Sequence, residues 1–184
     1  MIHWDPTASE ENKWLEDYLA LRVFEHDFEK AWKGLVLFKE YESQSRLAYA
    51  LFRDVVIAYS RPFRRSIGKY KSYKILSSDY IPIGMLALHD ELMTQRDTIF
   101  AHTDIAAKSP DLSRRRMNNG NGGYTFGMSF KHENLDHFFR REDEIKALIE
   151  AVWRKIREVI VVRDAELSAK LEEEDKKNLP QTPQ

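Results

Sequence analysis

The stretch LRVFEHDFEKAWKGLVLF, residues 21–38, carries apolar side chains at alternating steps of three and four residues. They are Leu21, Phe24, Phe28, Ala31, Leu35 and Phe38. Such steps place side chains on one face of an α-helix. Ser9 suits the N-cap position, and the acidic residues Glu10 and Glu11 follow it where negative charge favours a helix N-terminus. The sequence therefore predicts one long amphipathic helix from about Ser9 to Tyr41.

The same spacing predicts three further helices. One spans residues 43–59 and ends before Pro62, because proline disfavours helix in the residue that precedes it. The next begins at the cap candidates of residues 77–79, has a proline in its first turn, and runs to about residue 102. The last spans about residues 133–173. Four amphipathic helices are expected to pack as a bundle.

A short β-hairpin is predicted between the third and fourth helices. The cluster NNGNGG at residues 118–123 is followed by apolar residues that alternate with small or polar ones. Alternation after such a cluster is typical of the second arm of a hairpin. The expected fold is therefore all-α, an up-and-down four-helix bundle with a small β-hairpin insertion at about residues 112–130. We expect one domain over residues 1–174 and a disordered polar tail over residues 175–184.

The composition excludes several classes of protein. The absence of Cys excludes disulfide scaffolds, thiol catalysis and Cys-based zinc sites. No apolar stretch is long enough to cross a bilayer, and no secretory signal precedes the first helix, so we expect a cytoplasmic protein with no membrane partner. No HExxH pair and no phosphate-binding loop is present, so neither a metal site nor a cofactor is expected. A nucleotide or small-ligand site between helices is for the same reason the weakest of the functions considered.

The formal net charge of −1 conceals an uneven distribution. Residues 61–132 carry 12 basic and 6 acidic side chains between two acidic flanks, and a local basic region attracts phosphate backbones. The segment RPFRRSIGKYKSYK, residues 61–74, holds six basic and three aromatic side chains and no acid. This suits single-stranded RNA, although a solvated loop whose tyrosines pack onto the bundle explains it equally well. The residues expected to contact RNA are Arg61, Arg64, Arg65, Lys69, Arg114, Arg115 and Arg116.

The third predicted helix carries two stripes where a bundle core needs one. The first, expected to face the core, consists of Ile81, Met85, Leu88, Leu92, Gln95, Ile99 and His102. The second consists of Leu86, His89, Met93, Arg96 and Phe100. Arg, Met and aromatic residues are enriched at protein interfaces. We therefore expect this second stripe, with His89, Met93 and Phe100, to line a dimer interface or a cleft.

The segment LMTQRDTIFAHTD, residues 92–104, contains an Arg, a polar residue directly after it, and a His separated from the Arg by five residues. This pattern resembles the signature of the HEPN superfamily, and the phrase RDTIFAHTD is similar to its abortive-infection branch. The likeness extends loosely over the helical order from about residue 10 to residue 165. It implies a metal-independent endoribonuclease acting as a homodimer, in which the Arg and His of two protomers meet in a shared cleft. It also implies a toxin or phage-defence role, with an inhibitory antitoxin protein as partner.

The residue types of this motif suit cleavage of RNA through its own 2′-hydroxyl. His102 can take or deliver a proton near neutral pH, and the guanidinium of Arg96 can donate two hydrogen bonds to phosphoryl oxygens. A carboxylate beside a phosphate is repulsive unless it is paired, so Asp97 is expected to orient Arg96 or His102. Asp54, close to an apolar stripe, is a further candidate partner for Arg96. On a continuous α-helix, positions six apart lie roughly 120° apart, so Arg96 and His102 meet only if the helix ends near Ala101 or a second protomer contributes.

The alternative is a non-catalytic dimerisation or protein-interaction module of the same fold. It would use the second stripe to hold a partner. A His on an apolar stripe is more often a core residue than a catalytic one, so the module predicts His102 buried or turned away from Arg96. The enzyme instead requires both side chains in a solvent-accessible cleft.

Overall fold

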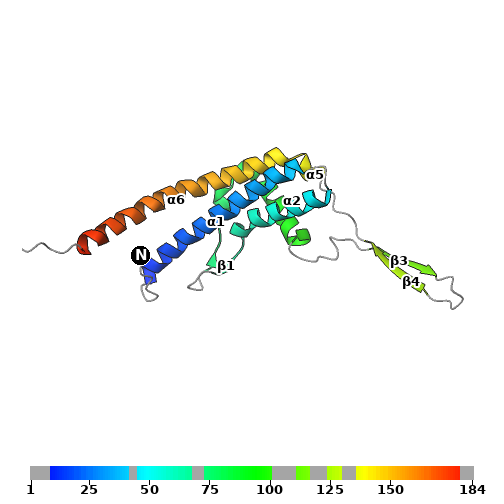
Figure 1. Ribbon diagram of the computed structural model, residues 1–184, viewed down its shortest axis with the longest axis horizontal. Helices are drawn as coiled ribbons and strands as arrows, with labels where there is room; N and C mark the ends of the chain where they lie inside the picture. Colours follow the sequence, from blue (N-terminus) through cyan, green and yellow to red (C-terminus); the bar gives the residue numbers. More distant parts are fainter. Residues whose placement is uncertain are drawn as a thin grey trace, which may run out of the picture.

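Four main helices run in alternating directions through a computed structural model, which describes residues 9–41, 45–67, 73–100, 111–116, 124–129 and 136–178 (Figure 1). They are α1 (Ser9–Glu40), α2 (Ser45–Ser60), α3 (Leu86–Gln95) and α6 (Glu142–Asn178). The shorter α2 packs against α1, and α6 lies along the other side of α1. The all-α fold with a small β insertion is therefore confirmed.

The core is built mainly from α1, α2 and α6. The predicted stripe of the first helix faces inward, with Phe24, Phe28, Ala31, Leu35 and Phe38 all buried. The inward positions of α6 are Ile145, Leu148, Ile149, Val152, Ile156 and Ile160. The short helix α5 (Asp136–Phe139) adds aromatic rings at one end of the bundle, where the rings of Phe38 and Phe139 stack with centroids 4.5 Å apart.

One glycine allows α1 and α2 to approach closely. A Cβ built on Gly34 of α1 would lie 2.9 Å from Cγ2 of Val55 on α2, closer than such carbons pack. Val55 is buried and β-branched, so its side chain has little freedom to move aside. The spacing of these two helices therefore depends on the missing side chain at Gly34.

The third helix differs from its prediction. A single helix over residues 77–102 is wrong, because the segment is divided into the 3-10 turns η2 (Ser78–Tyr80) and η3 (Ile83–Met85), the helix α3, and the π-helix η4 (Arg96–Phe100). Between the two 3-10 turns the backbone is extended at Ile81 and Pro82, as expected for a residue before proline. Ser77 does cap, but it accepts from the backbone N–H of Asp79 within a short turn rather than starting a long helix.

The predicted hairpin is present. Strands β3 (Asp111–Arg116) and β4 (Tyr124–Ser129) pair antiparallel, and Figure 1 shows them standing apart from the helices. A second, smaller pairing was not predicted: β1 (Ser66–Ile67) and β2 (Tyr73–Lys74) lie within the basic segment after α2. The tail predicted to be disordered begins at residue 175, but α6 continues to Asn178. The residues after Asn178 lie outside the described part of the chain.

The outer ends of α1 and α6 are joined by polar contacts. The hydroxyl of Tyr18 donates to Asp164 at 2.6 Å, and Arg22 forms a 3.1 Å ion pair with the same carboxylate. Farther out, the indole N–H of Trp14 donates to Glu166 at 3.3 Å. In these helices the buried apolar residues lie between Phe24 and Phe38 and between Ile145 and Ile160, so this outer pairing lies beyond the core. None of the described helices has the length and apolar composition needed to cross a membrane.

Candidate active site

Asp97 lies between two arginines that come from different parts of the chain. Nη1 of Arg96 donates to Oδ1 of Asp97 at 2.8 Å, and Nη2 of Arg64 donates to the other carboxylate oxygen. Arg96 and Asp97 begin η4, whereas Arg64 follows α2. All three side chains are partly exposed, 27% for Arg96 and 39% for the other two. The trio carries one net positive charge at the surface.

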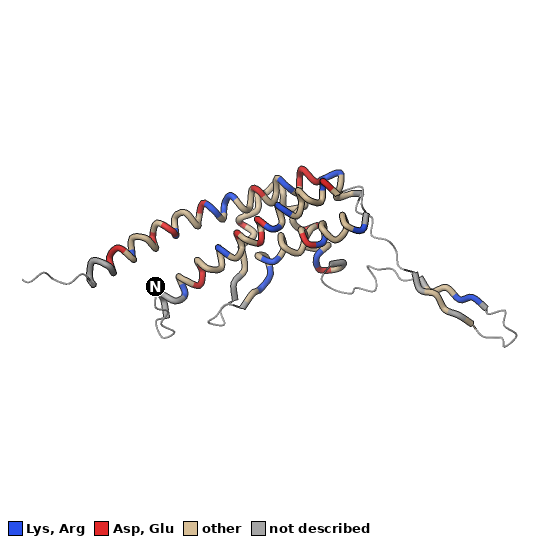
Figure 2. The backbone as a smooth tube through the Cα atoms, in the orientation of Figure 1, with Lys and Arg blue, Asp and Glu red and all other residues tan. Residues whose placement is uncertain are grey.

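A buried turn positions Arg64. The 3-10 turn η1 (Arg61–Phe63) begins with Pro62 in its first turn, where a missing N–H costs no hydrogen bond. Pro62 and Phe63 are buried, the N–H of Arg64 donates to the carbonyl of Arg61 at 3.0 Å, and that of Leu76 donates to Pro62 at 2.7 Å. Arg64 therefore projects from a fixed turn rather than from a solvated loop. Figure 2 shows the basic residues of this segment in blue, directly after α2.

The motif itself coincides with a change in helical pitch. The N–H of Arg96 donates to the carbonyls of both Leu92 and Met93, and η4 continues with the wider π-helical turn. The hydroxyls of Thr94 and Thr98 each donate to the carbonyl four residues earlier, at 2.8 Å, an arrangement that bends helices. π-helical turns are rare and occur frequently at functional sites. The 120° separation expected for a continuous α-helix therefore does not apply from Arg96 onward.

His89 occupies the interior rather than the surface expected of an interface residue. Its side chain is only 8% exposed, its Nδ1 shares a 2.8 Å hydrogen bond with the Tyr59 hydroxyl, and its ring packs edge-on against Phe63. Burial lowers the pKa of His89; Asp90 opposes this shift and Arg64 adds to it. Burial also raises the pKa of Tyr59, so the pair is neutral at physiological pH. His89 is thus a core residue, and it contacts Phe63, the residue that precedes Arg64.

Other sequence-predicted residues fall in several environments. Asp54 does not pair with Arg96: it is half exposed and forms a 3.2 Å ion pair with Lys30 of α1. Met93 is partly buried and packs against the core, and its role at an interface stays a prediction. Phe100 ends η4, with its side chain outside the described part of the structure. His102 also lies outside the described residues, so its expected role stays a prediction.

Two of the predicted RNA-contacting residues are paired with acidic side chains of the fold. Arg61 is bound to Asp27 of α1 at 3.2 Å, while Arg64 is bound to Asp97. Arg65, Arg114 and Arg115 are exposed. The backbone of Arg116 belongs to β3, its side chain is not described, and Lys69 lies outside the described residues.

Two features of the cluster were missed by sequence reasoning. Arg64 was expected to contact RNA directly, and its pairing with Asp97 had no sequence signal, because 32 residues separate the two. Tyr59 was not singled out, although its hydroxyl satisfies His89 in the core. The pairing of Asp97 with Arg96 was one of the two arrangements expected, and it is observed.

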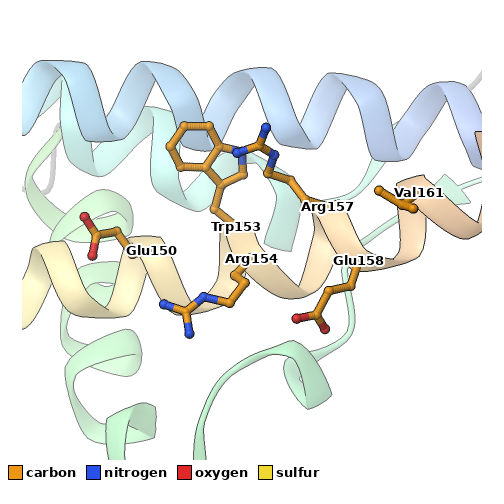
Figure 3. Close-up of a pocket in the computed structure, with 6 residues that line it drawn as sticks. All are labelled: Glu150, Trp153, Arg154, Arg157, Glu158 and Val161. Atoms are coloured by element: carbon orange, nitrogen blue, oxygen red, sulfur yellow. The ribbon is translucent and has the colours of Figure 1, made fainter.

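A groove lies elsewhere on the molecule, along α6. It has a volume of about 500 Å³ and is lined by Glu150, Trp153, Arg154, Arg157, Glu158 and Val161. Figure 3 shows Trp153 and Arg157 projecting toward α1, where Arg157 forms a 3.4 Å ion pair with Glu25. Glu150 likewise accepts from the indole N–H of Trp32 on α1 at 2.9 Å, and the groove includes no residue of the motif. No group of three or more potential metal ligands occurs among the residues that the structure describes.

Comparison with known protein families, with curated proteins and with solved structures finds no match to this chain. The likeness to the HEPN superfamily therefore rests on the motif at residues 96–102 and on the order of the helices.

Proposed function

We propose that this protein is a metal-independent endoribonuclease of HEPN-like type, acting as a homodimer with Arg96 and His102 in a shared cleft. The observation that carries the proposal is the pairing of Asp97 with both Arg96 and Arg64. An unpaired carboxylate next to the motif arginine would repel a phosphate. With two guanidiniums bound to it, the carboxylate is neutralised and instead orients them.

The resulting cluster is complementary to a phosphodiester. A guanidinium carries five N–H donors, of which the bond to Asp97 uses one on Arg96. The net positive charge of the trio matches the single negative charge of a phosphodiester. Nε of Arg64 is buried and has no hydrogen-bond partner among the described residues, so this guanidinium is not fully satisfied by its bond to Asp97. Partial exposure of Arg96 and Arg64 leaves the cluster accessible to a ligand.

The chemistry follows from the groups that the motif supplies. A base removes the proton of the RNA 2′-hydroxyl, the 2′-oxygen attacks the adjacent phosphorus, and the 5′-oxygen leaves after receiving a proton. His102 performs one of these transfers, and a water molecule performs the other. Arg96 stabilises the negative charge that develops on the phosphoryl oxygens. The products are a 2′,3′-cyclic phosphate and a 5′-hydroxyl. The HEPN likeness extends the proposal to a toxin or phage-defence role under the control of an inhibitory protein.

The test is cleavage of mixed cellular RNA by the purified protein in EDTA. The unaltered chain should generate cyclic-phosphate ends, whereas Arg96→Ala and His102→Ala should lose at least about a hundredfold in rate. Arg53→Ala is a matched control, because it removes an exposed arginine of α2 that is not part of the motif. Circular dichroism and thermal unfolding should show that all variants fold alike.

Cleavage that survives both motif substitutions would contradict the assignment of Arg96 and His102. The same holds for cleavage that EDTA abolishes, since the proposed reaction uses no metal.

The alternative, a non-catalytic interaction module, draws on apolar side chains exposed on the long helices. Val161 and Val162 are adjacent and exposed on α6, and Leu19 and Val23 lie one turn apart and exposed on α1. Such side chains can bind another protein without any chemistry at the motif. A folded chain that self-associates through these helices and cleaves no RNA would favour this alternative.

A further inference from the structure

The hairpin formed by β3 and β4 has one face that combines aromatic, aliphatic and basic side chains. In the register, Arg114 lies opposite Phe126, and Leu112 and Tyr124 are each two residues from that pair along their strands. Side chains of directly paired residues, and of residues two apart, project from the same face of a ribbon. Leu112, Arg114, Tyr124 and Phe126 therefore share one face, which we call the aromatic face.

The aromatic face is uncovered. Leu112 is 64% exposed, Phe126 66% and Tyr124 48%. A two-stranded hairpin is marginally stable in water unless its apolar side chains pack against something. Exposed rings on a ribbon that stands apart from the helices therefore indicate a surface adapted to a ligand (Figure 1).

The charge of the hairpin indicates what this ligand is. Its twelve strand residues include three arginines and a single acid, Asp111, at one end of β3. The guanidinium of Arg114 lies over the Tyr124 ring, 4.8 Å from its centre, so the positive charge covers one face of this ring and a base would stack on the opposite face. On the other face of the hairpin, the pair Ser113 and Gly127 has only small side chains, and the Ser113 hydroxyl donates to the carbonyl of Gly127. The combination of basic and aromatic groups is thus confined to one side.

The spacing of the two rings fits unpaired bases. Residues two apart on a strand are separated by about 6.6 Å, roughly twice the 3.4 Å rise between stacked bases. Proteins that hold single-stranded nucleic acid stack bases on aromatic rings and place Arg or Lys along the backbone. A duplex keeps its bases stacked inside, so it offers no base faces to Tyr124 and Phe126.

We propose that the aromatic face binds single-stranded RNA, with Tyr124 and Phe126 stacking on unpaired bases and Arg114 contacting the backbone. This inference rests on the proposed function for the choice of RNA, and it specifies the substrate class as unpaired RNA. The hairpin then acts as a binding arm that delivers RNA strands to the motif arginines.

The test measures binding of a fluorescein-labelled, single-stranded 2′-O-methyl RNA to the full-length chain by fluorescence anisotropy. This probe has no 2′-hydroxyl, so it cannot be cleaved by the proposed reaction. Phe126→Ala should weaken its binding about tenfold or more, because base stacking on one ring is lost. Binding of the same sequence as a duplex should not respond to Phe126→Ala.

A matched pair of substitutions separates the face from general charge. Arg114→Gln and Arg115→Gln remove the same charge from adjacent positions on opposite faces. Arg114→Gln should weaken binding of the single strand several-fold more than Arg115→Gln. Equal effects of the two, or unchanged binding by Phe126→Ala, would overturn the proposal.

Light scattering on the same proteins tests whether the aromatic face binds a second copy of this chain instead of RNA. If Phe126→Ala halves the molecular mass in solution, the face holds another protomer and the RNA proposal is wrong. The two proposals fail separately: an inactive chain that still needs Phe126 to bind RNA contradicts only the ribonuclease. An active chain that binds RNA independently of Phe126 contradicts only the binding arm.

Discussion

At the scale of single residues, Asp97 has the role of an internal counter-ion. Its two carboxylate oxygens are bound by guanidiniums from Arg96 and Arg64, which would otherwise repel one another. Exposed ion pairs contribute about 1 kcal/mol or less to the free energy of unfolding. Their value here is therefore geometric: they fix the direction of the arginines.

Substitution of Asp97→Asn should accordingly reduce the rate of RNA cleavage much more than it reduces stability. The neutral amide keeps the size of the side chain but loses two charge-assisted hydrogen bonds, so Arg96 is less well oriented. We expect a fall in kcat/KM of roughly tenfold to a hundredfold, and a change of about 1 kcal/mol or less in the free energy of unfolding. The control is Asp54→Asn, which removes an exposed carboxylate paired with Lys30. Equal activity of the two variants would contradict the role of Asp97.

His89 should make the stability of the fold depend on pH. Its pKa is lowered in the folded state by burial, so the unfolded chain binds the proton more readily. The free energy of unfolding should therefore be fully retained above about pH 6.5, the ordinary pKa of His, and should fall as the pH drops below it. Urea unfolding at about pH 7.5 and about pH 5.5 measures the difference.

The control variant for this pH effect is His89→Gln, whose side chain can still form a hydrogen bond with the Tyr59 hydroxyl but does not titrate. It should show a smaller loss of stability between the two pH values than the unaltered chain. An identical loss would mean that other groups cause the pH dependence.

Sequence reasoning reached the candidate site only in part. The neighbouring motif residues Arg96 and Asp97 were found because they are local in sequence, and their pairing was among the expected arrangements. The contribution of Arg64 depends on how α2 packs beside η4, and no periodicity in the sequence contains that information. Asp54 was expected to pair with Arg96 but pairs with Lys30, because α1 lies next to α2 at this point and no pattern in the sequence indicates that contact.

At the scale of helices, the spacing of apolar residues predicted an element correctly where one of its faces is continuously apolar. The stripe from Leu21 to Phe38 predicted the helix and the cap candidate Ser9 predicted its start, so the expected range of Ser9 to Tyr41 is close to the observed Ser9–Glu40. The prediction of the third helix was wrong for two reasons. Pro82 favours extended backbone in the residue before it, and the hydroxyls of Thr94 and Thr98 donate to backbone carbonyls near the motif. Local hydrogen bonds of this kind leave no periodic signal. The hairpin was predicted well because the Asn/Gly cluster and the alternation that follows specify it locally.

The contact between α1 and α2 gives a direct test of this packing. Gly34→Ala adds a methyl group that would meet Val55 in the core, so we expect a loss of about 1–3 kcal/mol in the free energy of unfolding. An exposed helical glycine would behave in the opposite way, since alanine stabilises helices by about 1 kcal/mol.

Chemical denaturation of Gly34→Ala and of the double variant Gly34→Ala/Val55→Ala measures the effect. In the double variant the removed methyl groups make room for the new one, so the two substitutions should cost less together than the sum of their separate effects. Strict additivity would show that Gly34 and Val55 do not interact.

At the scale of the whole molecule, the proposed cleft requires two chains. A homodimer has twice the 21.7 kDa mass of the chain. If each site takes Arg96 from one protomer and His102 from the other, mixed dimers of Arg96→Ala and His102→Ala contain one intact site. Random mixing of the two inactive proteins should then restore about a quarter of the cleavage activity.

This complementation is measured after unfolding the two variants together and refolding them, with each variant refolded alone as the control. Sites built within one protomer would give no recovery. Mixing Arg96→Ala with Asp97→Asn, which alter neighbouring residues of the same segment, provides a second control and should give less recovery.

The outer pairing of α1 with α6 has a consequence for motion. Trp14 and Tyr18 are held to α6 by polar contacts beyond the last buried apolar residues, so this end of the molecule can separate without exposing the core. Amide hydrogens on residues 14–20 and 163–172 should therefore exchange with deuterium through a shared local opening, well before those of residues 28–38 and 145–156. Tyr18→Phe should speed exchange in both helices at once and leave the core amides unchanged. The two long helices would then act as a clamp that opens from its tip while its base stays folded.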